Sequence, residues 1–314
     1  MSEASGVYDG SPAGSGGPLD LIVVGAASRD VTPENPRGWR LGGAATYCSL
    51  TAARLGLRVG CVMGVDGPAA DAEELASLEA AGVLVHRVAL ERGPVFENIE
   101  RDGHRRQRWL SKCDRVPAAA LPAEWRGTRG WLLGPVAGEV PPEWAKVAST
   151  RKDACVAVGW QGMLREFAAD GWVKRVDPAR SAILGVAGLV CASVDDVPPG
   201  VGLAELRAFA PRAAIFLTAG DLGGLAMRDE RLVRYPAVPA PRVVNATGAG
   251  DVFLAALMVE WLLNGDVATS RALRFAAAAG SCAVAGAGIA GVPTEAQVAE
   301  RLRLRASSGS PPGA

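Results

Sequence analysis

Lysine and histidine are scarce in this sequence of 314 residues, and each shortage argues against a class of enzyme. Only four of the 33 basic residues are lysines, and none of the four lies in a GK[ST] context, so a Walker A phosphate loop is excluded. His86 and His104 are the only histidines, and their surroundings fit neither HExxH zinc proteases nor the usual Ser-His-Asp hydrolases.

The sequence also lacks net charge and paired cysteines. Its 33 basic and 33 acidic residues balance, whereas nucleic-acid binders usually carry a basic excess that neutralises phosphates. The six cysteines are widely spaced and form no CxxC pair, which argues against a zinc site and against a disulfide framework. We therefore expect a protein of the reducing cytoplasm that binds no nucleic acid.

An uncharged stretch of 20 residues, 275–294, imitates a membrane span. It consists mostly of alanine and glycine, whose transfer into a bilayer is poor, so we predict a close-packed internal helix and no membrane partner. Both ends of the chain are rich in glycine, serine and proline, and we predict flexible tails over 1–18 and 306–314. The first of these lacks the apolar centre of a signal peptide.

Buried strands alternate with helices along residues 19–305, which predicts one large α/β domain with a mostly parallel sheet. The run at 19–25 is continuously apolar, as in a strand covered on both faces, and a helix that ends near Gly56 precedes the next strand at 58–65. An acidic amphipathic helix follows that strand. Further strands are predicted at 130–136, 154–159, 188–193 and 213–218.

Two segments read as β-hairpins. In the first, 94–110, extended arms flank Asp102-Gly103, a pair typical of a type I′ turn, and alternate polar positions suggest that the hairpin projects from the main sheet. The second, 223–237, has its turn at Asp229-Glu230.

The most informative segment is 241–262, an apolar strand that runs through a small-residue turn into a long apolar helix. At Gly248, Ala249 and Gly250 no bulky side chain blocks the backbone, so successive N–H groups can converge on an anion. Asp251 lies in the first helical turn, where the helix dipole is expected to hold it ionised, ready to accept a proton from a hydroxyl. The alternative is that Asp251 only caps the helix.

The order of these motifs resembles the PfkB/ribokinase family of small-molecule kinases, from about Leu19 to about Arg305. NATGAGD at 245–251 matches the family motif DTxGAGD, and GGAATYCSLTAARLG at 42–56 matches the N-terminal motif without a gap. Weaker features fall in the same order: the Gly25-to-Asp30 spacing, the turn containing Thr218, Gly220 and Gly223, and an Ala-rich helix followed by GAGIAGVPT.

The resemblance implies a ribokinase-like three-layer α/β/α sandwich with a small β-sheet lid near 26–41 and 94–110. It implies transfer of the γ-phosphoryl group of ATP, with Mg²⁺, to a hydroxyl of a sugar or cyclitol. Asp251 would be the base and the amides of Ala249 and Gly250 would stabilise the transferring group. The other implied site residues are Asp30, Gly42, Gly43 and Tyr47 for the acceptor, and Thr218, Gly220, Gly223, Thr247 and Gly288 for the nucleotide. The alternatives, which we weigh below the functional role for Asp30 and the glycine pair, are a strand-end turn, a helix-entry turn and, for 94–110, a surface hairpin.

Several positions depart from the family pattern. Ser193 and Asp196 stand where an NxxE motif usually organises Mg²⁺, and Asp196 keeps a shorter carboxylate as a metal ligand. Ala44 and Tyr47 replace polar residues that bind ribose in ribokinases, which makes ribose a doubtful acceptor.

Gln161 and Arg165 follow a central strand, as in the branch that contains myo-inositol kinases, and would contact a polyol or a phosphate, unless they form a hydrogen-bonded turn. Glu139 is expected at the mouth of the pocket, with a solvated loop acid as the alternative.

Other functions compete with this interpretation. GAGIAG at 286–291 satisfies GxGxxG, but it follows a helix, and too little chain remains for a dinucleotide-binding unit. The basic run HRRQR at 104–108 would attract an anionic substrate or simply form a solvated hairpin face. A nucleoside kinase of the same fold, and a non-catalytic binding or scaffold protein, remain alternatives, and a homodimer through the lid is left open.

Asn245 stands where the family usually has aspartate, a position that in many members helps to bind an activating monovalent cation. Because the carboxylate is missing, we predict little activation by potassium. Activity measured in potassium and in sodium salts checks this, and strong stimulation by potassium over sodium would contradict it.

Overall fold

The computed structural model describes residues 17–101 and 104–308, and its centre is a nine-stranded sheet. The strand order is β15-β14-β13-β12-β9-β8-β1-β4-β5. Seven of these strands run parallel to one another: β1 (Leu21–Ala26), β4 (Val59–Val65), β5 (Leu84–Ala89), β8 (Gly130–Leu133), β9 (Cys155–Gly159), β12 (Leu189–Ser193) and β13 (Ala214–Thr218). The hairpin β14 (Gly224–Arg228) and β15 (Arg231–Tyr235) extends this sheet in the antiparallel direction.

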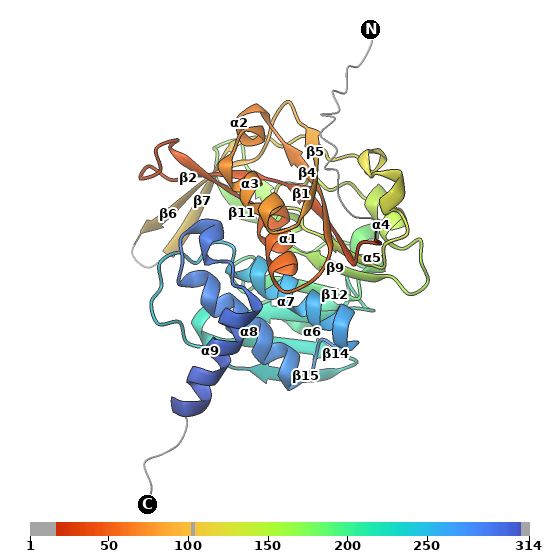
Figure 1. The fold of residues 1–314 in the computed structure, drawn as a ribbon, viewed down its shortest axis with the longest axis vertical. Helices are drawn as coiled ribbons and strands as arrows, with labels where there is room; N and C mark the ends of the chain where they lie inside the picture. The colour runs from red at the N-terminus through yellow and green to blue at the C-terminus, as the bar shows by residue number, and fades with distance from the viewer. Residues whose placement is uncertain (1–16, 102–103, 309–314) are drawn as a thin grey trace, which may run out of the picture.

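Helices cover both faces of the sheet, because the side chains of each central strand alternate between two cores. Leu21 and Val23 of β1 belong to the core beneath one helical layer, and Ile22 and Val24 belong to the other core. The first layer contains α1 (Ala44–Arg54), α2 (Gly67–Ala70), α3 (Glu73–Ala80), α7 (Ala249–Asn264), α8 (Ser270–Val284) and α9 (Glu295–Ser308). The second contains α4 (Glu143–Ala148), α5 (Ala182–Val186) and α6 (Leu203–Arg207) (Figure 1).

The strand order reverses at β1, which lies between β4 and β8. The chain builds outward from β1 through β4 to β5 on one side, and through β8 to β13 on the other. In open parallel sheets ligands bind beyond the carboxyl ends of the strands at such a reversal. The segments that follow β1 and β8 are therefore where a site is expected.

A separate four-stranded sheet, called the small sheet below, projects from this edge of the molecule (Figure 1). Its order is β3-β2-β6-β7, and its strands are β2 (Ser28–Val31), β3 (Trp39–Gly42), β6 (Val95–Arg101) and β7 (His104–Ser111). The expected pairing of the 94–110 hairpin is present between β6 and β7, and its Asp102-Gly103 turn lies outside the described residues.

A short hairpin, β10 (Arg165–Phe167) and β11 (Val173–Arg175), supports the small sheet from the body of the protein. The Trp109 indole of β7 donates a hydrogen bond to the carbonyl of Ala168 at 2.9 Å, and its ring centroid lies 5.6 Å from that of Phe167. A bridge between Arg108 and Trp172 joins the same two elements. The small sheet therefore rests on this hairpin.

The fold class predicted from the sequence is confirmed, with differences in detail. The 223–237 hairpin forms as expected, with left-handed φ angles of 46° at Asp229 and 65° at Glu230, as its tight turn requires. The single acidic helix expected after β4 is instead two short helices, α2 and α3. Helix α8 occupies the first half of the uncharged stretch 275–294.

The structure qualifies two predictions about the chain ends and membranes. No helix within the part of the chain that the structure describes is long and apolar enough to cross a membrane. At the C-terminus α9 continues to Ser308, past the expected start of a tail at 306. Most of both predicted tails lies outside the described residues.

Candidate functional site

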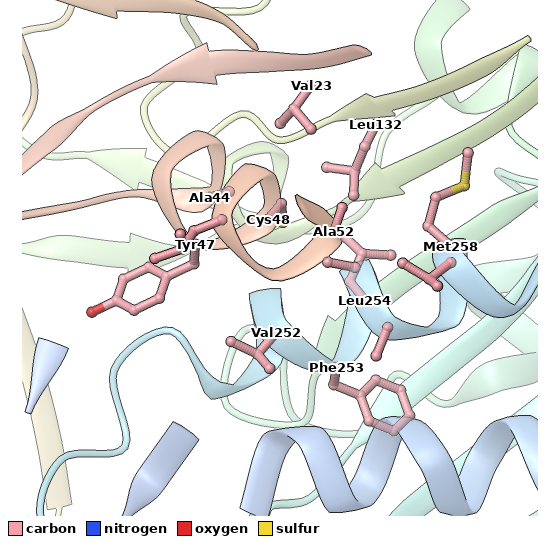
Figure 2. Close-up of a cluster of buried hydrophobic side chains, with 14 of the residues drawn as sticks. Val23, Ala44, Tyr47, Cys48, Ala52, Leu132, Val252, Phe253, Leu254 and Met258 are labelled. Atoms are coloured by element: carbon pink, nitrogen blue, oxygen red, sulfur yellow. The ribbon is translucent and has the colours of Figure 1, made fainter. Parts of the chain in front are cut away.

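Two helices begin side by side at the carboxyl edge of the large sheet, and both begin at a glycine. Gly43 precedes α1 with φ 89°, and Gly248 precedes α7 with φ 83°, so both need the left-handed region that side chains rarely adopt. Tyr47, only 3% exposed, fills the space beside Gly248, where an added Cβ would lie 2.4 Å from its ring (Figure 2). The two positive helix ends are thereby held close to each other.

Within the part of the chain that the structure describes, the turn that was predicted to bind phosphate has its unpaired N–H groups one residue later than expected. The N–H of Ala249, one of the expected donors, already donates to the carbonyl of Ala246 at 3.3 Å. Gly250 is exposed, and within the described ranges the N–H groups of Gly250 and Asp251 have no hydrogen-bond partner. Because the first amides of a helix point along its axis, these two are the donors available to an anion.

Asp251 lies in an environment that favours its neutral form. Burial, followed by the carboxylate of Asp196, raises the pKa of Asp251 to about 7, with Asp30 adding to this and Arg165 opposing it. The expectation that the helix dipole would hold this carboxylate fully ionised is therefore wrong, because desolvation and two neighbouring acids outweigh the dipole. A group with this pKa accepts a proton more readily than an ordinary carboxylate does.

Asp30 and the glycine pair meet as predicted from their motifs. Ser28 donates a hydrogen bond to Asp30 at 2.9 Å. A Cβ on Gly42 would lie 2.4 Å from the Asp30 carboxylate, and one on Gly43 would lie 2.6 Å from the carbonyl of Ala26. The pair is therefore required by the close approach of β2, which brings Asp30 near enough to influence the pKa of Asp251.

A cavity of about 430 Å³ opens between the small sheet and the loop that leads into α7. Asp30, Tyr47, Thr247 and Gly288, four of the predicted site residues, line it together.

Sequence reasoning missed several other residues of this cavity. The small sheet contributes Arg40 and Asn98, and the loop before α7 contributes Val243 and Val244. Arg40 lies opposite Asp30 in the β2–β3 register, so the two side chains are on one face. The alternation of side chains between the two faces of a strand is the sequence signal that would have identified Arg40 and Asn98.

Glu139 does not lie at the mouth of the pocket, and neither the predicted binding role nor the solvated alternative is correct. Its side chain is fully buried, and its carboxylate accepts hydrogen bonds from the N–H groups of Ala26, Val136 and Ala137 at 2.7 to 3.2 Å. Burial raises its pKa, and these three donors oppose the shift. Glu139 thus ties the end of β1 to the loop after β8 at the point where the strand order reverses.

Gln161 and Arg165 do not line the cavity but contact Asp196. Arg165 Nη2 lies 2.8 Å from Asp196 Oδ1, and Gln161 Nε2 lies 3.3 and 3.4 Å from the two carboxylate oxygens. Asp196 is therefore an ion-pair partner, and its predicted role as a metal ligand does not fit these contacts. No group of three or more potential metal ligands occurs among the residues that the structure describes.

The remaining predicted nucleotide residues occupy turns. Thr218 ends β13 and donates a hydrogen bond to Ala192, and Gly223 closes the turn into β14, where a Cβ would lie 2.1 Å from the carbonyl of Tyr235. Gly220 has a positive φ of 56° and open space where its Cβ would be. The side chain of Asn245 accepts a hydrogen bond from the N–H of Thr247 at 2.7 Å, which shapes the loop before the cradle.

The family comparison supports the motifs. Residues 201–295 match the sequence model of the pfkB family carbohydrate kinases. No curated protein sequence matches significantly. These residues include the whole of the 245–251 motif.

Solved structures share the fold over nearly their whole length. A nucleoside kinase from Methanocaldococcus jannaschii, described as an archaeal member of the ribokinase family, is 18% identical and covers 92% of this chain and 100% of its own (TM-score 0.67). A ribokinase from Arabidopsis thaliana, complexed with ribose and ATP, is 19% identical and covers 91% and 99% (TM-score 0.66). A pyrophosphate-dependent kinase in the ribokinase family, complexed with a pyrophosphate analog and myo-inositol, is 18% identical and covers 89% and 99% (TM-score 0.71).

Together the comparisons confirm the resemblance stated from the motifs, the fold class and the class of enzyme, a phosphotransferase that acts on a hydroxyl group.

Replacement of Asp251 by asparagine is predicted to change stability in a pH-dependent way. In the folded chain the pKa is raised to about 7, so between about pH 4 and pH 7 the folded state holds a proton that the unfolded state has released. Stability is therefore lost as the pH rises through this window, and the loss is complete above it. Asp251→Asn cannot ionise, so its melting temperature should exceed that of the parent at pH 8, and the difference should shrink toward pH 5.

Thermal melts at four pH values, with the exposed Asp195→Asn as control, test this expectation. A difference between Asp251→Asn and the parent that stays constant with pH would contradict the raised pKa.

Proposed function

We propose that this chain, which matches the PfkB family of carbohydrate kinases over residues 201–295 and has the ribokinase fold, transfers the γ-phosphoryl group of ATP to a hydroxyl of a sugar or cyclitol. The observation that carries the proposal is the arrangement at the start of α7. There an acid whose pKa is raised to about 7 directly follows an exposed glycine in a helix N-terminus with free amides. Base and anion site are thus adjacent in one helical turn.

In the proposed reaction Asp251 accepts the proton of the acceptor hydroxyl as its oxygen bonds to the γ-phosphorus. The bond between that phosphorus and the bridging oxygen breaks, and ADP leaves with the electron pair. The amides of Gly250 and Asp251 stabilise the negative charge on the transferring group, and most of the barrier is lowered by this positioning. Because the pKa of Asp251 is raised to about 7, the proton-accepting form of the base becomes available as the pH rises toward and through neutrality.

The acceptor would bind in the cavity beneath the small sheet, which then acts as a lid. Asp30 and Asn98 offer hydrogen-bond acceptors and donors to hydroxyls, and Arg40 adds a guanidinium opposite Asp30. A neutral polyol such as myo-inositol suits this mixture better than an apolar ring. Nucleosides are the nearest alternative, given the shared fold with the M. jannaschii nucleoside kinase.

Mg²⁺ would arrive with the phosphates of the donor. Asp196 is committed to Arg165 and Gln161, and magnesium commonly binds through substrate phosphates and water with few protein ligands. The ion would supply charge neutralisation on those phosphates. The proposed part of this chain is to hold the phosphoryl oxygens on the α7 amides and the acceptor proton on Asp251.

Asp251→Asn should lower turnover by several orders of magnitude. Loss of a positioned base typically costs about 10²- to 10⁴-fold in rate, so kcat should fall by that order while KM for the acceptor changes little. The assay is ADP release from ATP and Mg²⁺ with a panel of sugars, cyclitols and nucleosides, with the exposed Asp71→Asn as the matched control. Full activity of Asp251→Asn would show that the base is assigned wrongly, and a folded parent that turns over no member of the panel would favour a binding or scaffold role.

The donor is predicted to be a nucleotide and not bare pyrophosphate. Val243 belongs to the loop that leads into α7, on the side of the cavity away from the small sheet, and is 75% exposed, so a nucleotide base would gain an apolar contact there that pyrophosphate cannot. Val243→Asp should raise KM for ATP about tenfold, the value of one lost apolar contact. Leu232→Asp on the edge strand β15, 58% exposed, is the control. Preference of the parent for pyrophosphate over ATP, or an unchanged KM for ATP in Val243→Asp, would overturn the prediction.

A further inference from the structure

An unbroken series of side-chain hydrogen bonds connects the cavity with the region beside Asp251. Asn98, which lines the cavity from β6, accepts from Gln107 Nε2 of β7 at 2.9 Å. Gln107 Oε1 in turn accepts from Arg165 Nη1 at 3.0 Å. The other terminal nitrogen of Arg165 donates to Asp196 at 2.8 Å, so the guanidinium bridges two elements far apart in the sequence.

The register explains why these side chains meet. Asn98 and Gln107 are directly opposite each other in the β6–β7 pair. Phe96 and Trp109 form the pair two residues along the strands, so their side chains lie on the same face of the small sheet. Phe96 and Trp109 pack against Phe167, which shows that this face points toward β10. Gln107 therefore faces Arg165, the first residue of β10.

The end of the series at Asp196 is buried and is held by several contacts. The side chains of Asp196 and Arg165 are only 7% and 13% exposed, so the ion pair is shielded from water and the cost of separating its partners is high. Gln161 adds a contact to the same carboxylate. Asp196 also lies on the loop after β12, whose Val194 and Asp196 N–H groups are hydrogen-bonded to the carbonyls of Thr218 and Ser193. This loop adjoins the nucleotide turn predicted at 218–223.

We propose that Arg165 is a positioning residue that couples the seating of the small sheet to the placement of Asp196 beside Asp251. One guanidinium holds Gln107 with one nitrogen and Asp196 with the other, so a shift of β7 is transmitted to the 193–197 loop and back. An acceptor that contacts Asn98 would thereby favour one arrangement of the catalytic centre. The hydrogen-bonded series itself needs no bound ligand. The inference rests on the proposed function only where it assigns the coupling a role in catalysis.

We expect a change in the small sheet to disturb the 193–197 loop, and a change in the loop to disturb the small sheet to a similar extent, because a coupling free energy acts equally in both directions. Gln107→Leu, a change in the small sheet, should speed amide hydrogen exchange at Val194 and Asp196 by about threefold or more. Asp196→Asn, a change in the loop, should speed exchange at Trp109, whose N–H donates to Gly171, to a similar extent. Arg165→Met should speed exchange at both places. Arg165→Lys should restore the parent rate at one of them at most, because a single ammonium nitrogen cannot hold Gln107 and Asp196 with two separate donor nitrogens as a guanidinium does.

The measurement is hydrogen exchange with mass spectrometry on the unliganded full chain. Arg175→Met is the matched control, because Arg175 is the exposed partner of Arg165 in the β10–β11 pair. Acceleration at the distant end in both Gln107→Leu and Asp196→Asn supports the coupling. Acceleration confined to the mutated element in these two variants would overturn it, whether or not Arg165→Met folds.

Kinetics provide a second, separable test with ATP and myo-inositol as probes. A residue of the small sheet that only binds the acceptor raises KM alone when it is replaced. Gln107→Leu should instead also lower kcat, by about threefold or more, because Asp196 is displaced as well. Should myo-inositol not be phosphorylated by the parent, the proposed acceptor fails while the exchange experiment still decides the coupling. An unchanged kcat in an active Gln107→Leu would count against it.

Discussion

The contact between the glycine-capped starts of α1 and α7 is the constraint on which the rest of the site depends. Tyr47 packs against the backbone of Gly248, and the thiol of Cys48 lies 3.4 Å from the carbonyl of Asp251, so the two helices are seated against each other within their first turns (Figure 2). Any side chain at Gly248 would collide with the tyrosine ring. The small-residue turn therefore serves the packing as well as the exposure of amides to an anion.

The electrostatic character of the site follows from this close packing. Asp30, Asp196 and Asp251 come from three different segments; the first two disfavour the ionised form of Asp251, and Arg165 is the cation that opposes them there. Burial and the two nearby carboxylates together raise the pKa of Asp251 to about 7. The same arrangement that destabilises the ionised acid makes it a better proton acceptor.

Much of this structure could be predicted from the sequence because its signals are local. The apolar runs, the glycines before α1 and α7, and the Asp229-Glu230 turn each specify their own conformation. The pairing of Arg165 with Asp196 could not be predicted, because it depends on β9 lying next to β12 in the sheet, and strand order is not written in any one segment. Glu139 was misjudged for a related reason, since the three backbone donors that surround it belong to the end of β1 and to the loop after β8, which are far apart in the sequence.

The scarcity of lysine acquires a physical meaning once the site is assembled. A P-loop places a lysine on the phosphates, whereas here the positive potential comes from two helix ends and from a guanidinium that is already paired with Asp196. Three acids near the cradle leave the centre without surplus positive charge. A highly charged donor is therefore expected to bring its own cation, because a proton taken up by Asp251 would remove the base that the proposed transfer needs.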